Sequence, residues 1–248
     1  MIYYYSGCGN SRWIANEIAQ STQDNLLFIP EISETEQSIE GQSIGFVFPI
    51  YSWAAPQVVE DFILKTQWSG TPKYVWFACT CGDEMGKTFD TFTKTLKKVG
   101  LTLNAGFCFQ MPETYLCFPG FHLDSKENEQ AKIDAARAKL PGVIEDIKAC
   151  KLVRDEIVGS FPRFKSFVIR PGFIKNVTDK KYHTNDTCTG CGLCATKCPF
   201  HNIEIKNGKP EWQGHCTQCM ACYHYCPQNA IHFATYTQNK GQYYCKEK

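Results

Sequence analysis

One pattern of four cysteines followed by a proline occurs twice in this chain of 248 residues. The first copy runs from Cys188 to Pro199 and the second from Cys216 to Pro227, both with the spacing C-x2-C-x2-C-x3-C-P. Thiolates are metal ligands, and eight of them at fixed intervals constrain the backbone because a metal centre fixes where each sulfur lies. This repeat therefore restricts the fold more than any other part of the sequence.

The spacing indicates which metal centre the cysteines bind. Three cysteines at a three-residue stride can wrap one face of an iron–sulfur cube, and the fourth, which precedes the proline, ligates the other cube. Structural zinc sites instead use two separate C-x2-C pairs, and a disulfide framework needs an oxidising compartment. We therefore predict two 4Fe–4S clusters, and hence electron transfer. The expected ligands are Cys188, Cys191, Cys194 and Cys226 for cluster 1, and Cys216, Cys219, Cys222 and Cys198 for cluster 2.

The similarity of the two copies extends past the cysteines. Residues 202–205 after the first copy correspond to residues 230–233 after the second, and each stretch is typical of a short strand. Between them lies Asn207-Gly208, a pair that favours a type I′ hairpin turn. On these cysteines and strands, residues 182–234 resemble the bacterial two-cluster 4Fe–4S ferredoxins. The resemblance implies a small α+β domain that transfers electrons.

Composition narrows the class of protein further. Hydrophobic residues make up 43% of the chain, which allows a sizeable core, and the net charge of +1 argues against a dedicated nucleic-acid binder. No stretch predicts a membrane-spanning helix, and the first residues lack the pattern of a signal peptide. The cysteines outside the repeat are irregularly spaced, which suits free thiols in a reducing compartment. We expect a cytoplasmic protein of an anaerobe. These other cysteines are Cys8, Cys79, Cys81, Cys108, Cys117, Cys150 and Cys245.

The start of the chain has the pattern of a strand, a loop and a helix. An apolar run over residues 2–5 precedes the loop Ser6-Gly7-Cys8-Gly9-Asn10-Ser11, and helical spacing follows over 10–22. A glycine-rich turn before a helix N-terminus offers N–H groups to an anion. The third glycine of a dinucleotide fingerprint and the Gly-Lys-Ser/Thr of a Walker loop are both missing. The loop resembles the flavodoxin phosphate loop, with Cys8 where that family usually carries threonine.

Two further loops follow predicted strands, one after residues 44–48 and one after residues 74–79. The flavodoxin resemblance implies that they flank the isoalloxazine ring of FMN, and ligands of open α/β sheets lie outside the carboxyl ends of the strands. Tyr51 and Trp53 could stack on the ring or fill the core below it, and Asp83 could instead cap the next helix. The candidate FMN-binding residues are Ser6, Gly7, Cys8, Gly9, Asn10, Ser11, Pro49, Tyr51, Ser52, Trp53, Thr80, Cys81, Gly82 and Asp83.

Alternating strands and helices predict the fold of the first 150 residues. Further strands are expected at 26–29 and 101–109, with helices near 10–22, 56–66, 85–99 and 127–149. This alternation favours a doubly wound parallel sheet of the α/β class, with the flavodoxin-like order 2-1-3-4-5. We predict a flavodoxin-like FMN-binding domain over 1–150, a connecting arm over 151–181, a ferredoxin domain over 182–234 and a C-terminal tail over 235–248.

Two connecting segments each fit several roles. The segment Met111–His122 is aromatic and long for a connection, so it could cover the flavin, meet the ferredoxin domain or pack on a helix. Residues 151–182 contain eight Lys or Arg and three acidic residues among several phenylalanines. Such a segment can touch a membrane, nucleic acid or an acidic redox partner. We favour an arm whose apolar side packs on the two domains while its basic residues stay solvated.

As a whole, the chain resembles the flavodoxin–ferredoxin fusion proteins of anaerobes, the EFR-type ferrodoxin family. The resemblance depends on Ser6–Ser11, the Met111-Pro112 segment and the eight repeated cysteines. It implies FMN and two 4Fe–4S clusters, without fixing a substrate. The histidines near the repeat are expected beside the clusters or at the surface, because eight thiolates already fill both sites. They are His183, His201, His215, His224 and His232.

Three functions fit the sequence. The first is an electron carrier that relays electrons between the clusters and FMN and serves redox partner proteins. The second is an enzyme in which FMN reduces a small organic acceptor, with Cys79 and Cys81 as spare thiols near the flavin. The third is a redox sensor, which the lack of a recognisable DNA-reading module disfavours. We favour the carrier, with no nucleic acid as partner; catalytic residues and the oligomeric state are not predicted.

Overall fold

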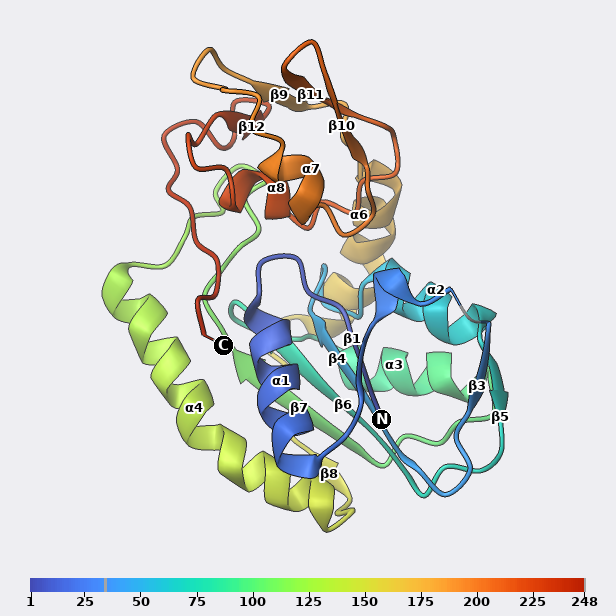
Figure 1. The fold of residues 1–248 in the computed structure, drawn as a ribbon. Coiled ribbons are helices and arrows are strands. Elements are labelled where there is room, and N and C mark those ends of the chain that lie inside the picture. The colour runs from blue at the N-terminus through green and yellow to red at the C-terminus, as the bar shows by residue number, and fades with distance from the viewer. Residues whose placement is uncertain (34, 248) are drawn as a thin grey trace.

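A six-stranded parallel sheet forms the centre of the larger part of the molecule (Figure 1). The computed structural model describes residues 1–33 and 35–247. The strand order is β2-β1-β4-β6-β7-β8, and every neighbouring pair is parallel. The strands are β1 (Ile2–Tyr4), β2 (Leu26–Phe28), β4 (Ser43–Pro49), β6 (Tyr74–Cys81), β7 (Ala105–Gln110) and β8 (Val153–Arg154).

This order confirms the predicted flavodoxin-like fold. With β1, β2, β4, β6 and β7 counted as the five predicted strands, the sheet has the order 2-1-3-4-5. Every residue of the central strand β6 is buried, as expected of a parallel strand that is covered on both faces. One strand of this sheet was not predicted, nor was the separate pair of strands described below. The two-residue β8 pairs with β7, so residues beyond 150 also belong to the sheet.

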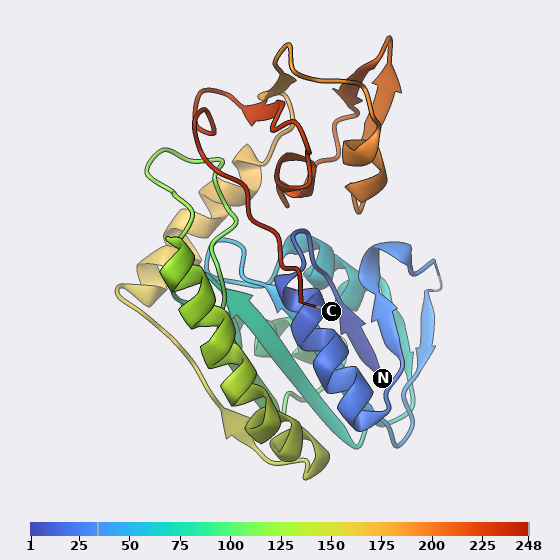
Figure 2. The same ribbon diagram turned by 60° about the vertical axis from the view of Figure 1, so that its left-hand side comes forward.

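Helices cover the two faces of the sheet (Figure 2). The helices α1 (Asn10–Thr22) and α4 (Lys126–Lys148) lie on one face, and α2 (Gln57–Lys65) and α3 (Thr88–Lys97) on the other. Each face has its own apolar cluster: Trp76 and Phe107 are among the residues buried under α1 and α4, and Phe46 and Phe77 are among those buried under α2 and α3. The helix bounds agree closely with the predicted ones.

A short parallel pair extends the edge beside α2. It is formed by β3 (Glu36–Ser38) and β5 (Gln67–Ser69), which pair in register. The one-turn helix η1 (Ile29–Glu31) follows β2 on the same side. Tyr3 ties this edge to the main sheet, because its hydroxyl donates a hydrogen bond to the side-chain oxygen of Gln37 at 2.8 Å.

The cysteine repeat forms a second, smaller part above the carboxyl ends of the main strands (Figure 1). It contains two strand pairs, β10 with β11 and β12 with β9, and two short helices. Asn207 and Gly208 between β10 and β11 both have positive φ, which confirms the predicted type I′ turn. The elements are β9 (Tyr182–Thr184), α7 (Leu193–Lys197), β10 (Ile203–Lys206), β11 (Lys209–Trp212), α8 (Ala221–His224) and β12 (Ile231–Phe233).

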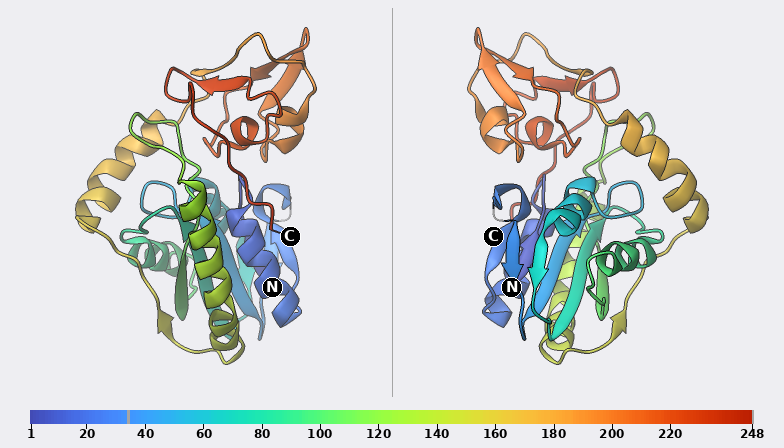
Figure 3. Two further views of the ribbon diagram at one scale, coloured as in Figure 1. Left: turned by 90° about the vertical axis from the view of Figure 1, so that its left-hand side faces the viewer. Right: turned by 90° about the vertical axis from the view of Figure 1, so that its right-hand side faces the viewer.

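A helical arm, residues 161–176, connects the two parts along one side (Figure 3). It consists of α5 (Pro162–Phe164), the π-helical turn η2 (Lys165–Ile169) and α6 (Arg170–Asn176). We expected its apolar side to pack on the two domains, and this holds for Phe173, whose ring lies 5.9 Å from that of Tyr115, but not for most of the arm. Phe161 and Phe164 are 79% and 56% exposed, whereas Ser166 and Arg170 are buried.

The polar residues of the arm turn inward because each finds a partner in the main domain. The guanidinium of Arg170 donates to the backbone oxygen of Ala55 at 2.9 Å and pairs with Glu60 at 2.7 Å. The Ser166 hydroxyl donates to the backbone oxygen of Trp53 at 3.0 Å. No helix within the described residues is long and apolar enough to cross a membrane.

Candidate functional site

Four cysteines from both copies of the repeat line one small cavity in the C-terminal part. Cys188, Cys191 and Cys194 come from the first copy, and Cys226 comes from the second. This is the set predicted for cluster 1. Burial is the main reason why the pKa of the Cys194 thiol rises to about 11, with Cys226 and Cys191 adding to the effect. A buried thiol of this kind needs the charge of a metal centre to stabilise its thiolate.

The other four cysteines gather at the side of this C-terminal part, the cysteine module of β9 to β12, that faces the sheet. Burial raises the pKa of Cys222 well above its usual value, and Cys219, Cys216 and Cys198 lie near enough to raise it further. This is the set predicted for cluster 2. In the described part of the chain, no three Cys, His, Asp or Glu side chains converge tightly enough for one ion. A cube needs a wider arrangement, because its four thiolates bind four different irons.

The backbone around the cysteines repeats as closely as the sequence does. Left-handed residues occur at matching places in the two copies: Gly190 and Gln218, Gly192 and Met220, His201 and Asn229. Such φ angles are costly for residues other than glycine. Gln218 and Met220 of the second copy adopt them although their own backbone preferences oppose it. The turns aim N–H groups at sulfur: Asn202 donates to Cys198 Sγ and Ala230 to Cys226 Sγ, both at 3.3 Å. Hydrogen bonds to sulfur stabilise thiolates and tune cluster potentials.

The predicted phosphate loop lies at the carboxyl end of β1 and leads into α1. Cys8, Gly9, Asn10 and Ser11 are buried. Across residues 1–33 and 35–247, no group accepts a hydrogen bond from the N–H of Gly7, Cys8, Asn10 or Ser11. Buried N–H groups without an acceptor are rare in folded proteins. At the start of a helix they form an anion site, so this donor set fits a phosphate group.

The phosphate loop is also where the two parts of the molecule meet. A Cβ atom on Gly7 would lie 2.7 Å from the Cβ of Cys219, so the backbone of one part touches a cysteine of the other. The Cys8 thiol donates to the backbone oxygen of Cys219 at 3.3 Å. The tail closes the opposite side, because the N–H of Cys245 donates to the backbone oxygen of Cys8 at 2.8 Å.

The loop after β4 sends its two aromatic residues in different directions. The Tyr51 hydroxyl lies 3.3 Å from the Tyr5 hydroxyl, which in turn lies 3.1 Å from the Thr217 hydroxyl next to Cys216. Trp53 points to the other side, where its indole N–H donates to Glu84 at 2.8 Å. Tyr51 therefore faces the cysteine module, while Trp53 joins its own loop to the loop after β6.

The carboxyl end of β6 contacts the phosphate loop, and a carboxylate that we had not assigned packs on the loop after β6. The hydroxyls of Thr80 and Ser11 share a hydrogen bond at 2.8 Å. The Glu113 side chain packs on Gly82, where a Cβ would lie 2.2 Å from its Oε2. Burial is the largest influence on Glu113 and raises its pKa. The only sequence feature that could have indicated a role for Glu113 is its place in the long Met111–His122 segment.

Of the remaining predicted residues, Pro49 ends β4, Cys81 ends β6, and Ser52 has a positive φ of 48°. Asp83 accepts a hydrogen bond from Gln110 at its backbone oxygen.

Cys81 and Cys108 are buried with their sulfur atoms 3.5 Å apart, and Cys79 is buried beside them. Burial raises the pKa of Cys79. These thiols are part of the sheet's packing and do not face the phosphate loop's N–H groups.

The Met111–His122 segment meets the ferredoxin part. The backbone oxygen of Thr114 lies 2.8 Å from Nε2 of His224, and Leu116 and Cys117 join the apolar cluster of the module. Burial lowers the pKa of His224 to about 4. The neutral ring is held on its other side by Tyr243, whose N–H donates to Nδ1 at 3.2 Å. His224 therefore fixes the segment and the tail to α8.

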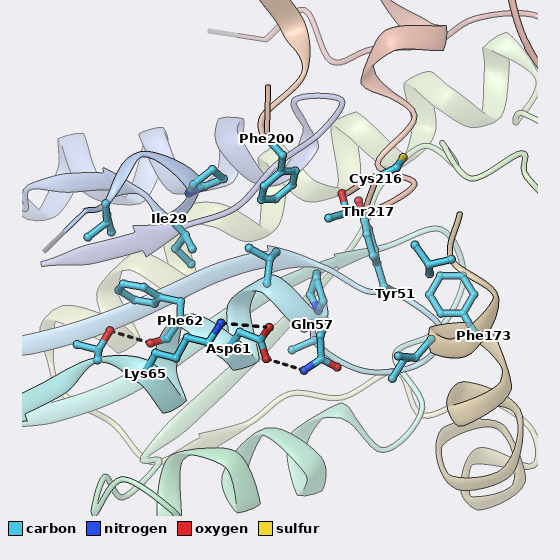
Figure 4. Close-up of a pocket in the computed structure, with 18 of the residues that line it drawn as sticks. Ile29, Tyr51, Gln57, Asp61, Phe62, Lys65, Phe173, Phe200, Cys216 and Thr217 are labelled. Carbon is cyan, nitrogen blue, oxygen red and sulfur yellow. Dashed lines mark hydrogen bonds and ion pairs between the residues drawn. The ribbon is translucent and has the colours of Figure 1, made fainter. Parts of the chain in front are cut away.

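A larger cavity of about 680 Å³ lies between the sheet, the helical arm and the cysteine module (Figure 4). Tyr51 stands at its upper end beside Thr217 and Cys216, while Phe200 of the module and Phe173 of the arm line other sides. Its floor is formed by η1 and α2. Among the predicted flavin residues, Tyr51 borders this cavity, and the phosphate loop does not line it.

Comparisons with known proteins support part of this organisation. Residues 187–231 match the family model of the 4Fe-4S dicluster domain. Solved structures similar to this chain include one described as a flavoprotein from Bacteroides uniformis, at 16% identity and a TM-score of 0.38, covering 54% of this chain and 96% of that one. Another is the two-electron reduced flavodoxin of Megasphaera elsdenii, at 18% identity and a TM-score of 0.32, covering 44% and 85%. No curated protein matches the chain significantly.

The protein is therefore an iron–sulfur protein of the electron-transfer class. Its C-terminal residues 187–231 match the 4Fe-4S dicluster domain. They follow an N-terminal domain whose strand order defines a flavodoxin-like fold, so the chain has the architecture of a flavodoxin–ferredoxin fusion.

Proposed function

We propose that the protein relays electrons between two 4Fe–4S clusters and an FMN. The observation that carries this proposal is the contact between Gly7 of the phosphate loop and Cys219 of the second cysteine group. A flavin phosphate site and a cluster ligand in direct contact leave no solvent layer between them. Joining both sites in one chain also replaces a diffusive encounter by a fixed geometry.

The residues of the chain have distinct roles in this function. Cys188, Cys191, Cys194 and Cys226 would hold cluster 1, and Cys198, Cys216, Cys219 and Cys222 would hold cluster 2. The N–H groups of Gly7, Cys8, Asn10 and Ser11 would bind the FMN phosphate, which supports FMN because riboflavin lacks this group. When bound, FMN exchanges one or two electrons, whereas each cluster exchanges one. The loops from Pro49 to Trp53 and from Thr80 to Asp83 would orient the ring.

A second candidate is an enzyme that uses the clusters to reduce a small organic molecule at the flavin. The 680 Å³ cavity beside Tyr51 favours this candidate, because ligand pockets are usually 300–1,000 Å³. In either case redox partner proteins would supply or remove electrons.

Anaerobic reconstitution followed by metal and flavin analysis tests the proposal. We expect about eight irons and one FMN per chain, and a redox titration that resolves both kinds of centre. Replacing Ser11 with alanine removes the hydroxyl that joins the phosphate loop to Thr80, so it should weaken FMN binding and leave the iron content unchanged. Bound zinc in place of iron, or full iron without any flavin binding, would overturn the relay.

A further inference from the structure

We propose that the 680 Å³ cavity binds a neutral, flat aromatic ring with carbonyl oxygens, of the quinone type. The inference rests on the proposed function only where it links this ligand to electron transfer, because the cavity borders Cys216, a predicted ligand of cluster 2. The binding site itself is inferred from the geometry of the cavity alone. Three separate parts of the chain build it: the edge of the sheet with α2, the helical arm, and the cysteine module (Figure 4).

The walls select for an apolar ring. Aromatic side chains approach from four segments, and aliphatic residues from η1, α2 and the arm fill the space between them. Flat rings pack favourably against such side chains in offset or edge-on arrangements. The four aromatic residues are Tyr51, Phe62, Phe173 and Phe200.

The charges in the wall are already paired, which favours a neutral ligand. Asp61 accepts a hydrogen bond from the Gln57 amide at 2.8 Å and lies 3.9 Å from the Lys65 ammonium (Figure 4). Arg170 is bound to Glu60 and to the backbone oxygen of Ala55. An ionic ligand would meet no free charge among the described lining residues.

The hydroxyls at the upper end supply the polar contact. Tyr51 and Thr217 both line the cavity and both contact the Tyr5 hydroxyl. A chain of three hydroxyls can rotate so that one of them donates to a carbonyl oxygen of the ligand. This end also adjoins Cys216, so a carbonyl bound there would lie beside the predicted cluster.

Two isoleucines of the arm provide a matched pair of variants. Ile174 lines the cavity and Ile169 does not, yet each is 39% exposed, so a tryptophan at either position should be tolerated. Binding of 2-methyl-1,4-naphthoquinone to the iron-loaded protein is measured by equilibrium dialysis. We expect Ile174→Trp to weaken binding at least about tenfold and Ile169→Trp to leave it unchanged. Tyr51→Phe should weaken it roughly two- to tenfold, the value of one hydrogen bond.

The outcomes separate this inference from the proposed function. Full iron and FMN without naphthoquinone binding, or equal effects of the two tryptophans, would overturn the cavity site alone. Tighter binding of a sulfonated anthraquinone would overturn the neutral ligand class. Competition by FMN would show that the cavity is the flavin site. Loss of iron with naphthoquinone binding retained would overturn the relay and keep the site.

The exposed side of the helical arm carries a second, independent inference: we infer that it docks on an anionic lipid surface. Phe161, Phe164, Phe167 and Val168 are all exposed on consecutive turns. Figure 3 shows the arm as an outer ridge of the molecule. Exposed apolar patches of this kind mark interaction surfaces. A ridge of aromatic side chains suits insertion between lipid headgroups better than a flat protein interface.

The charges around the ridge favour anionic lipid. The sequence has no acidic residue from position 157 to 178. Lys94 lies over the ring of Phe167 at 5.5 Å, and Arg163 and Lys175 are exposed on the arm. The acidic residues that do face the arm, Glu84 and Glu60, are paired with Lys165 and Arg170. Basic residues near the surface of an anionic bilayer each favour binding.

Flotation with vesicles tests the docking. The protein should float with phosphatidylcholine vesicles that contain phosphatidylglycerol, and more weakly with phosphatidylcholine alone. Combining Phe164→Ser and Phe167→Ser should lower the bound fraction at least about fivefold, whereas Leu152→Ser, at an isolated 80% exposed position, should not. Absence of flotation, or equal loss with Leu152→Ser, would overturn the inference. So would a change in self-association or in binding of an acidic protein without any flotation.

Discussion

The two parts of the molecule achieve their structure by different means. The flavodoxin-like domain has an apolar core on each face of its sheet, made of large side chains such as Trp76, Phe46 and Phe77. The module has one small cluster, which includes the predicted ligands Cys194 and Cys222. Part of that cluster belongs to the other domain, because Cys8, Leu116 and Cys117 contribute to it.

This difference indicates which part of the molecule depends on a metal centre for its folding. Large buried apolar surfaces stabilise a domain directly, whereas a module of about fifty residues needs a metal or another staple. Buried cysteines without a metal contribute little more than small apolar groups. We therefore expect the sheet domain to remain folded under conditions in which the module does not.

The largest effect is expected from removing a cluster ligand. Cys222→Ser should lose at least about half of the iron, because one cubane loses a ligand in the buried group that faces the sheet. The module should become sensitive to protease while the sheet domain keeps its unfolding transition. Iron analysis and limited proteolysis measure both. Cys150→Ser, a half-buried cysteine outside the repeat, is the control; full iron in Cys222→Ser would contradict the comparison.

A core variant should act in the opposite way. Phe77 is fully buried and stacks with Phe48, 5.7 Å between ring centroids, so Phe77→Ala should cost about 3–5 kcal/mol of unfolding free energy. Iron content should stay as in the parent protein at temperatures where the domain remains folded. Denaturant unfolding measures the loss. The exposed Phe118→Ala should change stability by less than about 0.5 kcal/mol.

A smaller effect is expected at the ion pair that holds the arm between the two parts. Arg170→Ala leaves the Glu60 carboxylate without its partner in a buried place, which should cost about 3 kcal/mol. Lys65→Ala removes an exposed pair with Asp61 and should cost less than about 0.5 kcal/mol. Denaturant unfolding and cleavage within the arm test this pair of variants. Similar losses in both would mean that the arm is not anchored by Arg170.

The smallest effect concerns the pH dependence of the sheet domain. Burial raises the pKa of Glu113 above its usual value of 4.5, so the folded state binds this proton more tightly than the unfolded state does. Its contribution to stability is therefore complete below pH 4.5 and is lost as the pH rises through the raised pKa. Glu113→Gln should remove this loss. Unfolding midpoints measured across this range should converge at low pH and separate at high pH; parallel curves would contradict the assignment.

Much of the fold could be predicted because its signals are local. The buried run of β6 and the helical spacing of α1 lie within single segments, and the order of the main strands follows from the alternation of strands and helices. The turn at Asn207-Gly208 also depends on two adjacent residues. By contrast, β8 has two residues and no pattern of its own, so it becomes a strand through its pairing with β7.

The arm shows most clearly where a sequence pattern fails. Its alternation of basic and apolar residues indicated an apolar side facing inward, but burial is decided by partners more than 100 positions away. Arg170 meets Glu60 across 110 positions, and Ser166 meets Trp53 across 113. Because these contacts satisfy polar groups inside, Phe161, Phe164 and Phe167 are left outside, while Phe173 packs on Tyr115.

The sequence by itself determined the cysteine ligands expected at the two cluster positions, the flavodoxin-like strand order and the place of the phosphate loop. Each of these features depends on the spacing of residues along the chain. The geometry of a metal centre or of the backbone then fixes where those residues lie. The tertiary structure alone decided that Cys219 contacts Gly7, that the tail closes over Cys8, and that a cavity opens beside Cys216. The first two contacts join the beginning of the chain to its end, and the cavity gathers segments from both parts and the arm. Their energies depend on packing that no local pattern encodes.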